Sequence, residues 1–187
     1  RVLIDSLPPE RLYGTANLAF LFQEAYLWQH LTVQQNLELI FQIYGKNVDS
    51  EHIKAHLDSV GLWDARSHYP YQVSLGIKAC TAIARATCFP PQVMPMDEPL
   101  ASLDSVRRTD MNKIVQKTCK QLCATSIWVT HDVVEAILFA DIVVAISPFK
   151  TFKVFDTKTL PKVDDSGCLP LSIRNLRDQI IDITSKE

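Results

Sequence analysis

Two short polar groups in the sequence carry residue types that suit phosphoryl transfer. Asp97 and Glu98 are adjacent carboxylates that follow the apolar run 93–96, and His131 comes soon after the apolar run 127–129. Adjacent carboxylates suit this chemistry because one can hold Mg²⁺ through its water shell while the next polarises an attacking water. Taken singly, the residues leave a structural interpretation open, in which Asp97 begins a turn and His131 caps a helix.

The elements that would position these groups are of two alternating kinds. Short runs rich in strand-forming residues are separated by segments with helical periodicity, and the runs are 18–22, 93–96, 126–130 and 142–146. This alternation predicts an α/β fold with a mostly parallel sheet. Ligands bind beyond the carboxyl ends of the strands in such a sheet, so we expect Asp97, Glu98 and His131 on one rim.

Helical periodicity is clearest after Thr32. Gln35 stands three residues on and completes a capping box, and Gly45 is placed to end the helix. Further helices are predicted after Ser50 and at 75–88, 106–122, 132–139 and 173–184. The first three helices could form a helical subdomain.

The composition is that of an ordinary globular protein. The 187 residues carry 19 basic and 21 acidic side chains, so nothing attracts the chain as a whole to phosphate backbones, and no nucleic-acid partner is expected. No apolar run reaches the roughly 18 residues that would span a bilayer. Five scattered cysteines without a C-x-x-C pair predict reduced thiols in a cytosolic protein. The chain opens at Arg1 without a signal-peptide pattern, so we expect it to begin within a domain.

Five motifs resemble, in order and spacing, those of the nucleotide-binding subunit of ABC transporters. The Q-loop is matched by Phe22 and Gln23, the signature by 73–77, the Walker B motif by 94–99, the D-loop by 102–104 and the H-loop by 129–132. The resemblance implies a partial P-loop NTPase-like ABC ATPase domain over 1–157, with a helical subdomain at about 32–88. Residues 158–187 would be a C-terminal extension. The stretch 128–148 is most similar to importers of nitrate, sulfonates and taurine.

The resemblance implies ATP and Mg²⁺ as cofactors and a role for each residue at the nucleotide. Glu98 would be the general base for water, and His131 would contact the γ-phosphate. Asp97 would hold the Mg²⁺ shell, while Gln23 would sense the metal and couple to the membrane domain. These residue types suit a transition state that spreads negative charge.

The resemblance also implies partners. Ser74 and Gly76 would reach the ATP of a second ATP-binding subunit, and Asp104 would communicate across that dimer. A transmembrane permease subunit and a periplasmic substrate-binding protein would complete an importer of a small anion such as nitrate, a sulfonate or taurine. The chain would then be cytoplasmic and peripheral on the inner face of the cell membrane.

The phosphate loop G-x-x-x-x-G-K-[ST] is absent from these 187 residues. No two glycines are five positions apart, since they stand at Gly14, Gly45, Gly61, Gly76 and Gly167. We therefore expect the chain to start after the place of this loop, and not to hydrolyse ATP alone.

Two further residues depart from the family pattern. Leu75 replaces the first glycine of the signature, where a side chain would obstruct close approach to a phosphate. Pro95 stands in a predicted central strand, where it removes a hydrogen-bond donor. These departures favour an alternative, a non-catalytic or degenerate ABC-fold interaction module, whereas Glu98, Gln23 and His131 favour an ATPase.

Two other signals admit more than one interpretation. His52 and His56 are four apart on a predicted helix and could share a metal, but no third ligand is near, so an exposed polar face is predicted. Trp28 follows Gln23 and is a candidate for contact with a membrane subunit or for a place in the core.

Overall fold

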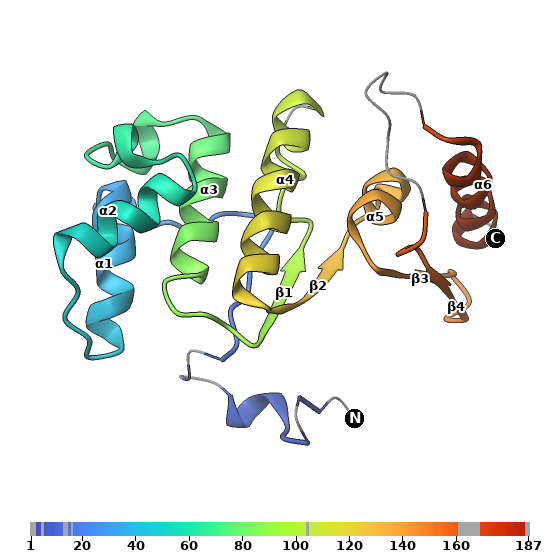
Figure 1. Cartoon of the computed structure of the whole chain (residues 1–187), viewed down its shortest axis with the longest axis horizontal. Helices are drawn as coiled ribbons and strands as arrows, with labels where there is room; N and C mark the ends of the chain where they lie inside the picture. The colour runs from blue at the N-terminus through green and yellow to red at the C-terminus, as the bar shows by residue number, and fades with distance from the viewer. Residues whose placement is uncertain are drawn as a thin grey trace. The chain divides into compact units, whose positions relative to one another are not determined.

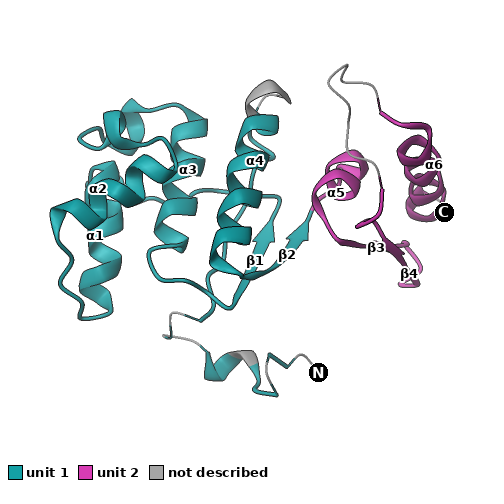
Figure 2. Ribbon diagram, in the orientation of Figure 1, with its two compact units in different colours: residues 1–129 teal, residues 130–187 magenta. Residues whose placement is uncertain are grey.

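The computed structural model describes residues 3, 4, 6–12, 15, 17–103, 105–160 and 169–185. The chain divides into two compact units, residues 1–129 and residues 130–187 (Figure 2). The predicted domain bounds, 1–157 and 158–187, follow the extent of the resemblance rather than packing. They differ from the division between the compact units, and they stay a prediction.

The first unit holds four α-helices and two β-strands among its described residues (Figure 1). Their bounds are α1 (Val33–Ile43), α2 (Ser50–Ser59), α3 (Leu75–Ala86), β1 (Val93–Asp97), α4 (Ser105–Leu122) and β2 (Thr125–Val129). Short 3-10 turns lie at Pro9–Arg11, Trp63–Ala65 and Pro70–Gln72. The helices predicted from periodicity are therefore present, with ends that shift by one or two residues.

The capping box predicted at the start of α1 is confirmed. The Thr32 hydroxyl accepts from the Gln35 backbone N–H at 3.2 Å, and Gln35 Oε1 accepts from the Thr32 N–H at 2.9 Å. Gly45 follows the helix with φ +64°, the left-handed conformation that ends helices. Helices α1 to α3 share one apolar core, which includes Val33, Leu37, Phe41, Ile53, Leu57 and Ala84.

Strands β1 and β2 are parallel, which confirms the predicted α/β fold with a parallel sheet. Met94 and Met96 of β1 are buried against residues of α3 and α4, in a second core that includes Leu21, Ile83 and Val115. The opposite face of the sheet carries exposed apolar side chains, namely Phe20, Phe22, Ile127 and Val129. Helices α3 and α4 therefore cover one face of this sheet.

The predicted strand at 18–22 is wrong in its extent, because Pro95 interrupts its pairing with β1. Two isolated parallel bridges replace it, Leu18 with Val93 and Leu21 with Met96. The Val93 N–H donates to the Asn17 carbonyl at 3.1 Å, and the Asp97 N–H donates to that of Leu21 at 2.9 Å. Pro95 lies between these two donors and has no N–H, so the ladder lacks its middle bond.

The second unit contains α5 (Val133–Phe139), β3 (Ile142–Ile146), β4 (Phe152–Asp156) and α6 (Leu171–Ser185). The predicted strand at 142–146 is present as β3, but it pairs antiparallel with β4, which was not predicted. Val143 and Ala145 of β3 are buried in a core with Ile137, Ile173 and Ile180. The predicted final amphipathic helix is confirmed as α6.

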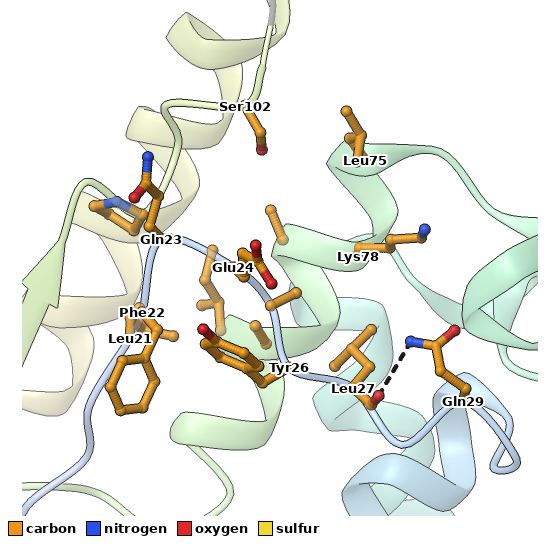
Figure 3. A pocket seen from close by; sticks show the side chains of 15 residues that line it. Leu21, Phe22, Gln23, Glu24, Tyr26, Leu27, Gln29, Leu75, Lys78 and Ser102 are labelled. Atoms are coloured by element: carbon orange, nitrogen blue, oxygen red, sulfur yellow. Dashed lines mark hydrogen bonds between the residues drawn. The ribbon is translucent and has the colours of Figure 1, made fainter.

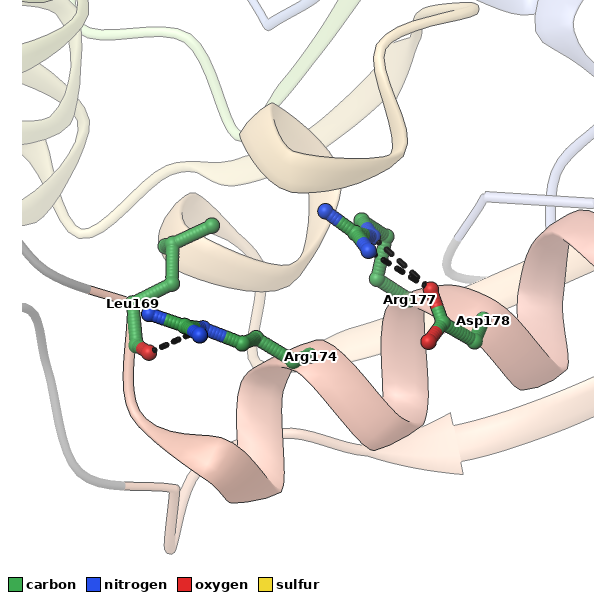
Figure 4. Close-up of polar contacts among 4 residues, drawn as sticks. All are labelled: Leu169, Arg174, Arg177 and Asp178. Carbon is green, nitrogen blue, oxygen red and sulfur yellow. Dashed lines mark hydrogen bonds and ion pairs between the residues drawn. The ribbon is translucent and has the colours of Figure 1, made fainter.

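Two arginines of α6 make local polar contacts (Figure 4). Arg174 Nε donates to the Leu169 carbonyl at 2.8 Å, and Arg177 pairs with the neighbouring Asp178 at 2.8 Å. An exposed pair of this kind contributes little to stability. Burial of Ile173 and Ile180 therefore carries the docking of this helix. Over the described part of the chain, no helix combines the length and apolarity needed to cross a bilayer.

Candidate functional site

The two adjacent carboxylates lie where β1 ends. Asp97 is the last residue of the strand and is exposed, and Glu98 follows it, half-buried. The Glu98 N–H donates to the Val129 carbonyl at 2.9 Å, which joins the ends of β1 and β2. Glu98 has φ +41°, a left-handed conformation that costs a non-glycine residue about 1–3 kcal/mol and that concentrates at functional sites. The carboxylate pair is thus held at the carboxyl end of a parallel strand.

Gln23 emerges at the same end of the sheet from the neighbouring segment. Two residues earlier, the Leu21 N–H donates to the Pro95 carbonyl, and the Leu21 carbonyl accepts from the Asp97 N–H, both at 2.9 Å. Because this pairing is parallel, Gln23 follows Leu21 beyond the edge where Asp97 ends β1. The structure therefore brings Gln23, Asp97 and Glu98 to one rim.

A cavity of about 480 Å³ opens beside this rim (Figure 3). Gln23, Glu24 and the residues after them line one side, and Leu75 and Lys78 of α3 line another. Ser102 and Pro99, which follow the carboxylate pair, complete the lining together with apolar side chains. The cavity thus lies between residues 22–28, the Gln23 segment, and the start of α3.

Ser74 and Gly76 lie at the start of α3. Ser74 is exposed, and its hydroxyl caps the helix by accepting from the Ile77 N–H at 3.4 Å. A Cβ built on Gly76 would meet Ser74 Oγ at 3.9 Å, an ordinary contact, so the packing of this chain does not require glycine there. Leu75 is 52% exposed. Leu75 therefore projects beside the two residues that were predicted to reach another subunit's nucleotide.

His131 lies in the second unit, between β2 and α5, and is exposed. Its predicted place on one rim with Glu98 joins residues of different units and stays a prediction. The cap of α5 is Asp132, whose carboxylate accepts from the Glu135 N–H at 3.0 Å, so the alternative that His131 caps this helix is wrong. Asp104 falls outside the described residues, so its predicted role stays a prediction.

The oxygen donors at the rim suit Mg²⁺ bound together with a substrate. Asp97 supplies an exposed carboxylate and Gln23 an exposed amide oxygen, both of the hard type that Mg²⁺ takes. No cluster of three or more histidine, cysteine or acidic side chains in the described stretches could cage a metal. Mg²⁺ usually takes one or two protein carboxylates, with waters and phosphate oxygens completing the shell, so this donor set fits that mode.

His56 does not belong to an exposed polar face, and the prediction for it is wrong. Its Nε2 lies 2.8 Å from the Ala84 carbonyl of α3, and the side chain is half-buried. Burial lowers the pKa of His56, which favours the neutral ring. The side chain joins α2 to α3, whereas His52 on the same helix is exposed.

Sequence reasoning missed Arg85 as a partner of the Gln23 segment. Its guanidinium donates to the backbone carbonyls of Ala25 and Tyr26 and stacks over the ring of Trp28. Trp28 is half-buried, and both its predicted places, in the core or against a membrane subunit, stay predictions. No short motif links residues this far apart, and only the fold brings them together.

The comparisons with known proteins agree on one family. A family model described as ABC transporter matches residues 6–101. The bicarbonate transport ATP-binding protein CmpC of Synechocystis sp. is 35% identical over 131 residues, which cover 68% of this chain and 20% of that protein. The aliphatic sulfonates import ATP-binding protein SsuB of Bacillus cereus is 34% identical over 141 residues, 74% of this chain and 56% of that protein.

The fold agrees with a solved structure. The chain superposes on cbiO1 from Clostridium perfringens, part of the ABC transporter complex cbiONQ, with a TM-score of 0.63 and 25% identity. The match covers 77% of this chain and 61% of that one. The chain spans between a fifth and about half of the length of the two curated relatives above.

Proposed function

We propose, from the premise that this chain belongs to the ABC transporter family, that it is part of an ATP-binding subunit that couples ATP hydrolysis to import of a small anion. The observation that carries the proposal is the carboxylate pair at the end of a parallel strand, with Gln23 at the same rim. Nitrate, a sulfonate or a taurine-like solute is the proposed cargo. The bicarbonate and sulfonate systems named among the relatives support an anion.

Each residue at the rim would have a different role in phosphoryl transfer. Mg²⁺, when bound with ATP, supplies positive charge that offsets the charge of the transferring phosphoryl group. Asp97 would hold it, with Gln23 as a second oxygen donor. Glu98 would orient the attacking water, and its carboxylate would accept the proton; the backbone bond to Val129 supports this role by holding the residue at the strand end. His131 would contact the γ-phosphate.

The proposed partners would meet surfaces beside the rim. Ser74 and Gly76 would face the nucleotide of a second ATP-binding subunit, and Asp104 would communicate across that dimer. The cavity between the Gln23 segment and α3 would receive the transmembrane permease subunit. A periplasmic substrate-binding protein would deliver the cargo, and the chain would lie on the cytoplasmic face of the cell membrane.

ATP binding requires a phosphate loop from outside these 187 residues. The loop supplies a lysine and several backbone donors, and about four such bonds at ~1.5 kcal/mol each amount to ~6 kcal/mol, or about four decades of affinity. Without it, a micromolar site becomes useless at cellular ATP concentrations. We therefore expect no ATP hydrolysis from the 187-residue chain by itself.

A second candidate function is a non-catalytic interaction module. The exposed Leu75 favours it, because a leucine at the start of α3 obstructs close approach of a phosphate to the backbone. The interrupted ladder at Pro95 favours it as well. In this case the cavity and the helices would serve docking alone.

The test joins this chain, as one fusion protein, to an added N-terminal segment that supplies a strand, a G-x-x-x-x-G-K-[ST] loop and a helix. Mg²⁺-dependent ATP turnover that is lost in Glu98→Gln supports the ATPase. Glu51→Gln is the matched control, because Glu51 is an exposed carboxylate in the first turn of α2. A fusion that folds and binds no ATP supports the interaction module. Turnover that survives Glu98→Gln contradicts the role given to Glu98.

A further inference from the structure

One arginine side chain of α3 holds the segment that follows Gln23. Arg85 Nη1 donates to the Tyr26 carbonyl at 2.7 Å, and its Nη2 donates to the Ala25 carbonyl at 3.0 Å. The guanidinium carbon lies 5.0 Å from the centroid of the Trp28 ring, within the range of a cation–π contact. A single side chain thus contacts three residues of a segment 57 to 60 positions earlier in the chain.

The backbone of this segment needs such restraint. Tyr26 has φ +41°, a conformation that a bulky residue keeps only where its surroundings enforce it. Leu21 is anchored at one end by its bonds to β1, and the Trp28 N–H is anchored at the other by Asn36 Oδ1 at 2.9 Å. The two Arg85 bonds act on the stretch between these anchors, next to the strained residue.

The geometry suits arginine in particular. Two successive carbonyls present two acceptors, and a planar guanidinium can meet both with donors held in a fixed fork. A lysine would keep the charge but would offer a single ammonium in place of the fork. Burial lowers the pKa of Arg85, yet a guanidinium remains charged at neutral pH, so both bonds are charge-assisted.

We propose that Arg85 is a positioning residue that fixes the Gln23 segment to α3. Gln23 on one side of the cavity and Leu75 at the start of α3 on another then keep a set spacing, and movement of the helix carries the segment with it. The functional meaning of this link rests on the proposed role of Gln23. The link itself rests only on the contacts of Arg85.

The test is amide hydrogen exchange on the whole chain, followed residue by residue. Arg85→Ala should speed exchange of the Trp28 N–H, the hydrogen-bonded amide at the end of residues 22–28, by about tenfold or more, because local opening is then opposed by fewer bonds. Arg85→Lys should leave exchange there clearly faster than in the wild type while restoring most of the thermal stability. Exchange within α1 should not change in either variant. If Arg85 served general stability alone, Arg85→Lys would restore hydrogen exchange in the segment to the same degree as thermal stability.

Arg66→Ala is the matched control. Arg66 also stacks on a tryptophan, with its guanidinium carbon 4.2 Å from the Trp63 ring centroid, and donates to the Trp63 carbonyl at 2.9 Å. This variant should leave residues 22–28 unchanged. The proposal would be overturned if Arg85→Ala exchanged in this segment at the wild-type rate. It would also be overturned if Arg85→Lys fully restored the wild-type exchange rate.

If Arg85→Ala does not fold, Arg85→Lys decides the question by the same measurement. The experiment uses no nucleotide. A negative result in hydrogen exchange therefore does not bear on the proposed ATPase function. Absence of ATP turnover in the fusion protein likewise does not bear on the role of Arg85.

Discussion

We predict that Asn36→Leu destabilises the folded chain by about 2 kcal/mol, although leucine has a similar size. Asn36 is fully buried in α1 and ties the end of the Gln23 segment to that helix. Its Oδ1 accepts from the Trp28 N–H at 2.9 Å. Its Nδ2 donates to the carbonyls of Trp28, Leu31 and Thr32 at 3.2, 3.1 and 2.9 Å.

The magnitude follows from which groups keep a partner. The Trp28 carbonyl still accepts from the Leu31 N–H, and the Thr32 carbonyl still accepts from the Asn36 N–H, so their loss is small. The Trp28 N–H loses its bond to the amide, and an unsatisfied buried donor costs about 1–3 kcal/mol. The lost bond to Leu31 adds about 1 kcal/mol, and apolar burial of the leucine offsets part of the total. The net loss, about 2 kcal/mol, changes the unfolding equilibrium by about thirtyfold.

The assay is urea unfolding followed by tryptophan fluorescence, with the free energy of unfolding taken by linear extrapolation. Gln34→Leu is the matched control, because Gln34 lies two residues before Asn36 in α1 and its side chain bonds to Glu38 Oε1 of the same helix, at 2.6 Å. Its replacement should change the free energy by less than about 0.5 kcal/mol.

The reasoning is refuted if Asn36→Leu costs less than about 1 kcal/mol, or no more than its control. Either result would mean that the Trp28 N–H finds another partner. The segment would then not depend on Asn36 for its anchor to α1.

Three further predictions concern packing, pH and thiol reactivity. Met94→Ala should cost about 2–5 kcal/mol in urea unfolding, because Met94 is fully buried, whereas Ile127→Ala on the exposed sheet face should cost far less. Burial lowers the pKa of His56 below its unfolded value, so the unfolded chain binds the proton more readily, and stability should fall as pH drops below about 6.5. In His56→Gln, the urea midpoint should change less with pH between neutral pH and about pH 5 than it does in the wild type. Burial raises the pKa of Cys88 to about 12, whereas Cys123 is exposed. Iodoacetamide should therefore alkylate Cys123 first, as measured by peptide mass spectrometry. Faster reaction at Cys88 would contradict its burial.

The helices could be predicted because their signals are local. Thr32 and Gln35 lie three positions apart and satisfy each other's backbone N–H within one turn. Gly45 adopts its left-handed φ without help from distant residues. Such features depend on a few neighbouring residues, so a short stretch of sequence is enough to place them.

Strand pairing was harder to predict because its partners lie far apart. The run 18–22 has strand composition, yet its ladder depends on whether β1 can donate at Pro95, about 75 positions later. Residues 152–156 become β4 only by pairing with β3, and the turn between them includes Lys150 at φ +60°. The composition of a segment does not determine which other strand it will pair with.

The sequence by itself determined the family and the residue types of the rim, because the motifs that carry Gln23, Asp97 and Glu98 are each a short local run of residues. Only the tertiary structure decided how the Gln23 segment is held. Arg85 reaches its two carbonyls across 59 and 60 positions, and His56 reaches Ala84 across 28. Backbone carbonyls are the acceptors in all three bonds, and every residue carries one, so no residue pattern marks which carbonyl a distant side chain will meet.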